Sequence, residues 1–341
     1  MNINQLKKTA DQMVISGKGI LAADESTPTC TSRFEALGIE SSAETRNKYR
    51  DMLLTTEGIE EFISGVILYD ETLRQSTVSN NELYPDFLSK KGILPGIKVD
   101  MGAKQLALHP NEKITAGLDG LHDRLKEYYL LGARFAKWRA VIIIGDDMPT
   151  NSCIQANAHA LARYAAICQE NSIVPIVEPE VLMNGSHTIE RCYQISEISF
   201  KKVFEEMDIQ GVNLEGIVLK PNMVISGIDC LKQASIEEVA DKTVECLKNT
   251  VPNKVPGCAF LSGGQSNHHA TEHLNRMNVK YKDLLPWNLT FSYGRALQSN
   301  ALKVWSGSDE NIRYAQQSFY ECAKSNSFAT KGEYSKEKIN V

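Results

Sequence analysis

The sequence predicts an α/β fold built as a single (β/α)8 TIM barrel, with an extra N-terminal helix and C-terminal helices. Eight short apolar runs alternate with segments of helical periodicity, a pattern typical of parallel strands joined by helical crossovers. Polar residues stand at the carboxyl ends of these runs, and in a barrel all such ends converge on one face. The rival is an open doubly wound sheet, which gathers ligands at one switch point and would leave several of these residues apart.

Bulk properties indicate one domain over 1–341. The chain shows no linker, low-complexity segment or membrane-length apolar run, and its net charge of −5 argues against nucleic acid or an anionic membrane as partner. Its eight cysteines are scattered without a C-x-x-C pair, which indicates reduced thiols. Because the N-terminus has helical periodicity rather than a signal-peptide core, we expect a cytoplasmic protein.

The elements follow in a regular order. A helix is expected over 1–16, where apolar residues fall at helical spacing. The eight apolar runs are 19–23, 65–69, 95–97, 133–138, 173–177, 216–219, 258–261 and 288–291. The fourth is the least well defined, because 141–144 is also strand-like. Ser41 with Glu44, and Ser235 with Glu238, form capping-box pairs that predict helix starts. Helices around 296–305 and 311–324 close the fold, and the polar segment 331–341 is expected to be mobile.

Lys220 ends the sixth run and is followed by Pro221, which stops the strand. Burial at such a position disfavours the charged ammonium and so favours a nucleophilic amine. Taken alone, this lysine could equally extend its ammonium to solvent. If Lys137 lies beside it, like-charge repulsion would favour the neutral amine further.

Other strand ends supply charges of both signs. Asp24, Glu178 and Glu180 offer carboxylates for proton transfer, and Lys98 and Arg139 offer cations for a phosphorylated substrate. Each could instead be a structural ion pair. Gathered at one barrel mouth, they predict an active site.

Two glycine-containing turns follow the last two strands. Ser262-Gly263-Gly264 precedes a helix and exposes backbone N–H groups, which form a natural phosphate cradle. Ser292-Tyr293-Gly294-Arg295 adds a hydroxyl and a guanidinium. Barrels commonly bind phosphate at the loops after strands seven and eight, although two ordinary glycine turns remain the alternative.

Two further motifs match patterns for a dinucleotide site and a zinc site, but the elements around them do not fit either kind of site. Residues 17–22 fit the dinucleotide pattern G-x-G-x-x-A, yet they follow a helix and open a strand, the reverse of what that motif requires. Residues 269–273 match H-x-x-E-H, but a zinc site needs another ligand and a partner element. We therefore expect neither a cofactor nor a metal.

These residues resemble the class I (Schiff-base) fructose-1,6-bisphosphate aldolase family. Seven stretches occur in the family's order, within a resemblance that covers the chain from about residue 10 to 334. They are 19–27, 96–100, 135–139, 173–180, 219–223, 261–266 and 291–297.

The resemblance implies a metal-independent lyase that reversibly cleaves fructose 1,6-bisphosphate to dihydroxyacetone phosphate and glyceraldehyde 3-phosphate. It implies that Lys220 forms the Schiff base with C2 and that Glu178 transfers protons as the imine forms. It further implies that Asp24 takes the C4 hydroxyl proton. Lys137 would hold and polarise the substrate, with Glu180 as its partner.

The resemblance also implies two phosphate sites and a homotetramer. The residues implied for the C1 phosphate are Ser262, Gly263, Ser292, Gly294 and Arg295. Those toward the C6 phosphate are Ser26, Arg33, Arg46 and Lys98. The sequence departs from the animal enzymes near the C6 end, at Pro28-Thr29, Ser32 and Met101. Two alternatives stay open: a Schiff-base barrel lyase for a related sugar phosphate, and a non-enzymatic sugar-phosphate-binding or scaffold protein.

Overall fold

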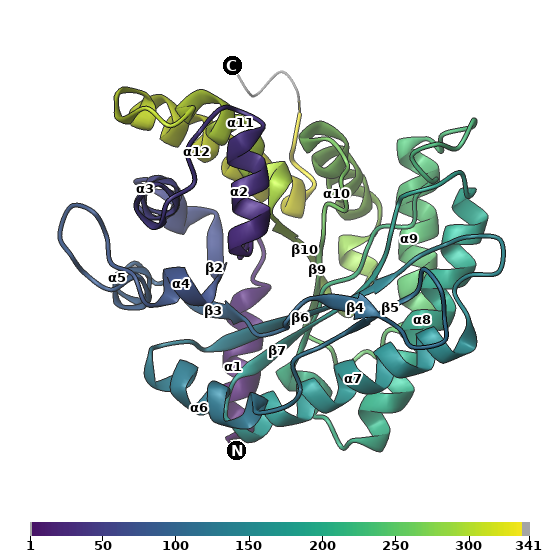
Figure 1. The fold of residues 1–341 in the computed structure, drawn as a ribbon. Helices are drawn as coiled ribbons and strands as arrows, with labels where there is room; N and C mark the ends of the chain where they lie inside the picture. The colour runs from purple at the N-terminus through teal and green to yellow at the C-terminus, as the bar shows by residue number, and fades with distance from the viewer. Residues whose placement is uncertain (1, 336–341) are drawn as a thin grey trace.

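The computed structural model describes residues 2–335 and shows a closed barrel of parallel strands surrounded by helices (Figure 1). Around the barrel the order is β1-β2-β3-β6-β7-β8-β9-β10, and β10 pairs with β1. This closure confirms the predicted barrel and excludes the open sheet. The barrel strands are β1 Gly19–Ala23, β2 Ile63–Leu68, β3 Leu94–Lys98, β6 Phe135–Ile142, β7 Val174–Val181, β8 Val218–Leu219, β9 Gly257–Phe260 and β10 Asn288–Tyr293.

Two further strands, β4 (Ala103–Gln105) and β5 (Lys113–Thr115), form an antiparallel ribbon between β3 and the next helix. None of the described helices is long and apolar enough to cross a membrane. The α-helices are α1 Ile3–Met13, α2 Thr27–Glu35, α3 Ala43–Leu54, α4 Asp70–Leu73, α5 Tyr84–Lys90, α6 Leu121–Leu130, α7 Asn151–Glu170, α8 Ile189–Ile209, α9 Ile236–Thr250, α10 Asn267–Tyr281, α11 Arg295–Trp305 and α12 Ile312–Lys331.

The first helix closes the amino-terminal end of the barrel. It spans Ile3–Met13 rather than the expected 1–16. Its apolar face, including Leu6 and Met13, is buried in one cluster with barrel residues such as Phe135. Ser64, at the start of β2, donates its hydroxyl to the carbonyl of Met13 at 2.7 Å. The carboxyl ends of the strands are therefore the end left open for a site.

The ring of Phe135, on β6, packs against one glycine of β2 and one glycine of β3 inside the barrel. A Cβ on Gly96 would lie 2.2 Å from the ring of Phe135, and one on Gly65 would lie 2.9 Å from it. Both distances are shorter than packed carbon atoms allow, so these two positions need glycine. The ring thereby supports the strands that carry Lys98 and Lys137.

The observed strands differ from the expected runs at several places, of which three follow. The fourth run and part of 141–144 form one continuous strand, β6. Strand β7 extends to Val181, so Glu178 and Glu180 lie within it and not after it. Strand β8 is short, because residues Leu214–Gly216 form a 3-10 turn.

The two predicted capping boxes have different outcomes. Ser235 and Glu238 form the complete box at the start of α9, as predicted. The prediction at Ser41 is wrong, because Ser42 caps α3 and accepts from the backbone N–H of Thr45. The Ser41 hydroxyl instead lies 2.6 Å from that of Thr31.

The predicted tail 331–341 begins at the last residue of α12. Beyond it, the backbone N–H of Tyr334 donates to Asn275 Oδ1 at 3.0 Å, so this part of the segment contacts α10. Residues 336–341 lie outside the described part of the chain.

Candidate active site

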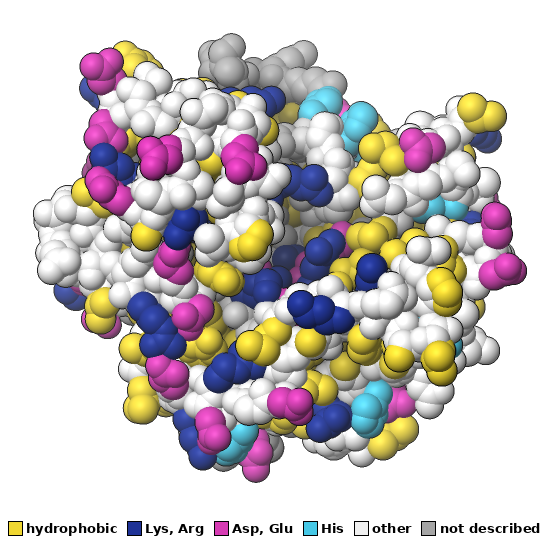
Figure 2. Space-filling model, in the orientation of Figure 1, with side chains coloured by type: hydrophobic (Ala, Val, Ile, Leu, Met, Phe, Trp, Pro, Cys, Tyr) yellow, Lys and Arg dark blue, Asp and Glu magenta, His cyan; other side chains and the backbone are white. Residues whose placement is uncertain are grey.

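The carboxyl ends of the strands surround a cavity of about 1110 Å³. Figure 2 shows this face hollowed near its centre, with lysine and arginine side chains gathered in and around the hollow. Every residue predicted for the site lines the cavity except Gly264 and Arg46. The convergence expected of a parallel barrel therefore brings residues from the whole chain to one place.

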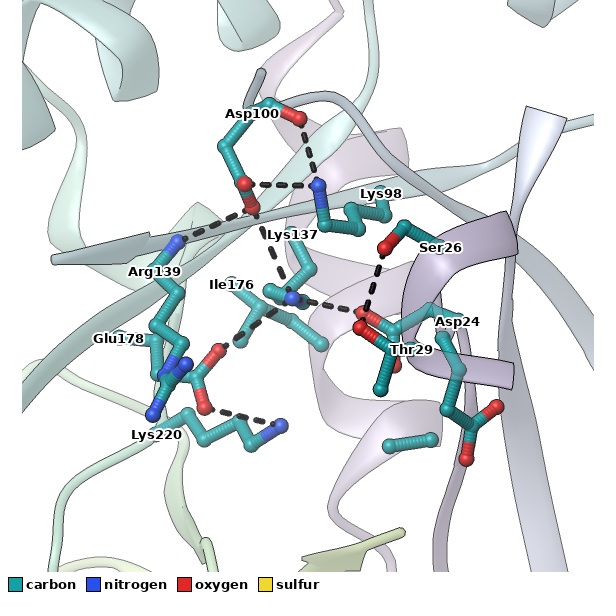
Figure 3. A network of polar contacts seen from close by, with 12 residues as sticks. Asp24, Ser26, Thr29, Lys98, Asp100, Lys137, Arg139, Ile176, Glu178 and Lys220 are labelled. Atoms are coloured by element: carbon teal, nitrogen blue, oxygen red, sulfur yellow. Dashed lines mark hydrogen bonds and ion pairs between the residues drawn. The ribbon is translucent and has the colours of Figure 1, made fainter. Parts of the chain in front are cut away.

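Lys137 lies at the centre of a buried ion-pair network (Figure 3). Its Nζ is 2.6 Å from Asp24 Oδ2, 3.6 Å from Asp100 Oδ2 and 3.7 Å from Glu178 Oε2. It points inward because strand residues alternate between faces and Phe135, two positions earlier, fills the interior. One ammonium therefore partly neutralises three carboxylates, which lie on or just after three different strands.

Two more lysines complete the network. Lys220 Nζ lies 3.1 Å from Glu178 Oε1, and Lys98 Nζ lies 2.7 Å from Asp100 Oδ1. Glu178 thus stands between the amines of Lys220 and Lys137, and all three side chains are buried. An amine held against a carboxylate in this way can exchange a proton with it during a reaction.

The partner of Glu180 differs from the expected one. Glu180 forms an ion pair with Nε of Arg139 and not with Lys137. Asp100, which the sequence analysis did not select, contacts Lys137 instead. The available signal was its place two residues after Lys98, just beyond the carboxyl end of β3.

The residues expected near the C6 phosphate separate into two groups. Ser26, Arg33 and Lys98 line the cavity. The guanidinium of Arg46 is bonded to Glu71 by two hydrogen bonds, Nε–Oε1 at 2.8 Å and Nη2–Oε2 at 2.6 Å, and Arg46 is absent from the lining. The structure therefore separates Arg46 from the other cations of this group.

Arg33 is held by a buried carboxylate that the sequence analysis also missed. Glu25 Oε1 lies 2.5 Å from Arg33 Nη1, and Glu25 Oε2 lies 2.7 Å from Arg50 Nη1. Arg50 comes from α3, so this pairing links the start of α2 to the next helix. No sequence motif indicates it, because the pairing depends on how α2 and α3 pack.

The residues expected at the C1 phosphate surround another part of the cavity. Gly263 and Gly264 have φ values of +59° and +96°, which glycine adopts without strain. Ser292 Oγ is buried and has no hydrogen-bond partner among the described residues. Arg295 begins α11, and its Nη2 would lie 3.2 Å from a Cβ on Gly264. Gly264 thus lies beside the guanidinium although it does not line the cavity.

A buried histidine supports this loop. His273 Nδ1 lies 2.7 Å from Gln265 Oε1, and Gln265 follows Gly264 directly. Burial, together with the nearby His269, lowers the pKa of His273 to about 4. The ring is therefore neutral near pH 7, and its Nδ1–H can donate to the amide oxygen. Among the described residues, no three His, Cys, Asp or Glu side chains are arranged to hold a metal ion.

The network shifts the ionisation of its own members. Burial opposes the charge on Asp24, but Lys137 and Lys220 outweigh it and hold the pKa of this carboxyl below its usual range. Burial likewise opposes the charge on Asp100, while Lys137 and Lys98 lower its pKa. For Lys137, burial is outweighed by Asp24, Asp100 and Glu178, which raise the pKa of the amine.

The directions of these three pKa shifts predict how the stability of the fold depends on pH. A lowered folded-state pKa means that the contribution of Asp24 and Asp100 is complete above the unfolded value of about 4 and is lost as pH falls through the folded value. The raised pKa of Lys137 keeps its contribution complete below about pH 10. We expect the free energy of unfolding, measured by urea denaturation, to fall below about pH 4.

Asp100→Asn is expected to be less stable than the parent at pH 6 and to lose less stability between pH 6 and pH 3. The exposed Asp123→Asn serves as the matched control and should keep the parent's dependence on pH. Equal acid-induced losses in the parent and in Asp100→Asn would contradict the prediction.

The fold and the cavity together define the class of protein: a (β/α)8-barrel enzyme with buried amines and carboxylates at the barrel mouth. Comparison with known proteins identifies the family within this class. The family model for class I fructose-bisphosphate aldolase matches residues 5–341. The chain is 55% identical over 335 residues to a probable fructose-bisphosphate aldolase class 1 of Xanthomonas axonopodis pv. citri, covering 98% of this chain and 99% of the relative.

Other relatives agree. The chain is 51% identical to fructose-bisphosphate aldolase 4, cytosolic, of Arabidopsis thaliana, over 93% of this chain and 80% of the relative. A crystal structure of the Plasmodium falciparum aldolase, in complex with TRAP and a small-molecule inhibitor, superposes with a TM-score of 0.95 at 46% identity, covering 97% of this chain and 95% of that one. The chain belongs to the class I fructose-bisphosphate aldolase family, the metal-independent type.

Proposed function

We propose that this chain cleaves fructose 1,6-bisphosphate reversibly to dihydroxyacetone phosphate and glyceraldehyde 3-phosphate through a Schiff base on Lys220. The observation that carries the proposal is the buried contact of 3.1 Å between Lys220 Nζ and Glu178 Oε1 inside the cavity. It places a potential nucleophile beside a proton acceptor, as imine formation requires.

The first half of the reaction needs an amine and a proton carrier. Lys220, once neutral, attacks the C2 carbonyl, and Glu178 transfers protons so that the carbinolamine oxygen leaves as water. The resulting protonated imine withdraws electrons from C3. Lys137, which also contacts Glu178, is placed to hold substrate oxygens near the imine.

The second half breaks the C3–C4 bond. Asp24 accepts the proton of the C4 hydroxyl, C4 becomes the carbonyl of the released aldehyde, and the bonding electrons pass to the imine as an enamine. The neighbouring ammonium of Lys137, 2.6 Å from Asp24, keeps this carboxylate ionised before the step. Protonation at C3 and hydrolysis of the imine then release dihydroxyacetone phosphate and restore Lys220.

The C1 phosphate fits the part of the cavity around Arg295. Arg295 has no ion pair within the described part of the chain, and Ser292 Oγ lacks a hydrogen-bond partner there. The positive φ values of Gly263 and Gly264 form a turn at the start of α10, where backbone N–H groups favour anions. A guanidinium, a hydroxyl and backbone amides are groups that commonly bind phosphate.

We further propose that the protein acts in the cytoplasm and assembles as a homotetramer. The Arabidopsis relative described as cytosolic supports the first point, and resemblance to the family supports the second. Light scattering coupled to size-exclusion chromatography tests the assembly, and a monomer at micromolar concentration would contradict it.

Trapping the imine tests the proposed function. The protein is incubated with dihydroxyacetone phosphate, reduced with borohydride and mapped by peptide mass spectrometry, with a sample lacking the ketose as control. We expect one adduct, on Lys220. An adduct on Lys137 alone, no adduct, or cleavage activity abolished by EDTA would each refute the proposal.

A further inference from the structure

Most of the cations that line the cavity are already neutralised. The three lysines of the buried network each contact a carboxylate, and so do Arg33 and Arg139. Arg124 donates to the carbonyl oxygens of Val99 at 2.9 Å and Gly117 at 2.5 Å. A cation held in this way must give up its partner before it can bind a substrate anion fully.

Two cations of the lining remain without such a partner. The side chains of Arg295 and Lys104 form no hydrogen bond or ion pair with another residue in the described range 2–335. Arg295 lies in the part of the cavity assigned above to the C1 phosphate. Lys104 lies on β4, in the ribbon that follows β3, and is exposed. The mechanism proposed above assigns no role to Lys104.

The topology separates these two cations across the barrel mouth. Arg295 follows β10, and Lys104 follows β3. In the closed ring of eight strands, β1 and β2 stand between β10 and β3, so the two cations lie three strand positions apart, close to the maximum of four. A ketose bisphosphate carries a dianionic group at each end of its carbon chain, and its two ends need cations at separate places.

We propose that Lys104 binds the second phosphate of a ketose bisphosphate, the one remote from the Arg295 end, and thereby sets the preference for bisphosphate over monophosphate substrates. The proposal rests on the proposed function. Lys98 is less available for this role, because its Nζ is 2.7 Å from Asp100 Oδ1 and also donates to the Asp100 carbonyl at 2.6 Å. Within the described residues Lys104 has no ion pair, so it can bring a positive charge to the second phosphate without breaking one.

The ribbon supplies a matched control. Lys104 is opposite Ile114, and Gln105 is opposite Lys113. Directly opposed residues share a face and successive residues alternate, so Lys113 lies on the other face from Lys104. Lys113 does not line the cavity. Lys113→Met therefore makes the same chemical change on the same ribbon without reaching the substrate.

The test compares kcat/KM for fructose 1,6-bisphosphate and fructose 1-phosphate, which lacks the second phosphate. For Lys104→Met we expect kcat/KM for the bisphosphate to fall about tenfold and that for the monophosphate to stay within about twofold, the size of one charged contact near a surface. Lys104→Arg should retain most of the preference and Lys113→Met all of it. Raising the salt concentration should reduce the parent's preference more than that of Lys104→Met.

Results other than those expected above would overturn the proposal. An unchanged ratio of the two kcat/KM values in Lys104→Met, or the same loss in Lys113→Met, would remove the role of Lys104 while the proposed function stands. A parent protein that prefers the monophosphate would also rule out this role of Lys104 and leave the proposed function intact. If the parent cleaves neither sugar and forms no borohydride adduct, the proposed function fails, and the inference fails with it.

Discussion

Lys220→Met is expected to lower kcat for cleavage of fructose 1,6-bisphosphate by about 10⁴-fold or more, the scale of losing a covalent nucleophile. Methionine keeps the length and apolar body of the side chain but has no amine, so no imine can form. Activity is measured by coupled assay of the triose products, and the same variant is tested for the borohydride adduct. Both should be lost together.

Two variants separate nucleophilicity from charge and from folding. Lys220→Arg keeps a positive charge opposite Glu178 but offers no nucleophilic amine, so we expect it to be folded and inactive as well. Lys303→Met, on α11 and outside the cavity lining, should behave like the parent. Retention of more than about 1% of parental kcat by Lys220→Met would rule out the Schiff base on this residue.

The second large effect is expected at Lys137. Lys137→Met should lower the free energy of unfolding at pH 7 by about 3–5 kcal/mol, because removing one partner from a buried ion pair leaves uncompensated charge. Here the ammonium contacts Asp24, Asp100 and Glu178. Urea denaturation measures the loss, and kcat should fall as well because the proposed substrate contact disappears.

The dependence on pH identifies the cause of that loss. Without Lys137 the pKa of Asp24 and of Asp100 should return upward, so the stability difference from the parent should shrink as pH falls toward 4. Lys137→Met combined with Asp24→Asn should recover part of the loss, since one unpaired carboxylate is removed. A loss that grows on acidification, or no more than that of the exposed Lys126→Met, would contradict this account.

Strand register decides which of the buried charges pair. Glu180 was expected to be the partner of Lys137, and the register of β6 and β7 explains why it is not. Lys137 is opposite Ile176, so Glu178 is the next inward residue on β7, and Glu180 is one pleat further along. A two-residue step along a strand is about 6.6 Å, which leaves Glu180 near Arg139.

Asp100 and Glu25 were missed for a related reason. Asp100 lies just after β3, and Glu25 lies between β1 and α2. The sequence shows a carboxylate at each place but does not show which way the side chain points. Whether Glu25 faces the substrate or Arg33 depends on how α2 and α3 pack over the barrel, and that packing brings Arg50 to it.

The sequence alone determined the barrel and most of the residues at its mouth. Strand length, alternation with helices and parallel direction follow from local patterns, and the convergence of all strand ends then follows from topology. Only the tertiary structure decided which charges pair, which are screened and which stay free. Ion pairing depends on register and helix packing within a few ångströms. This is why Glu178 rather than Glu180 contacts Lys137, and why the side chain of Lys104 has no ion pair within residues 2–335.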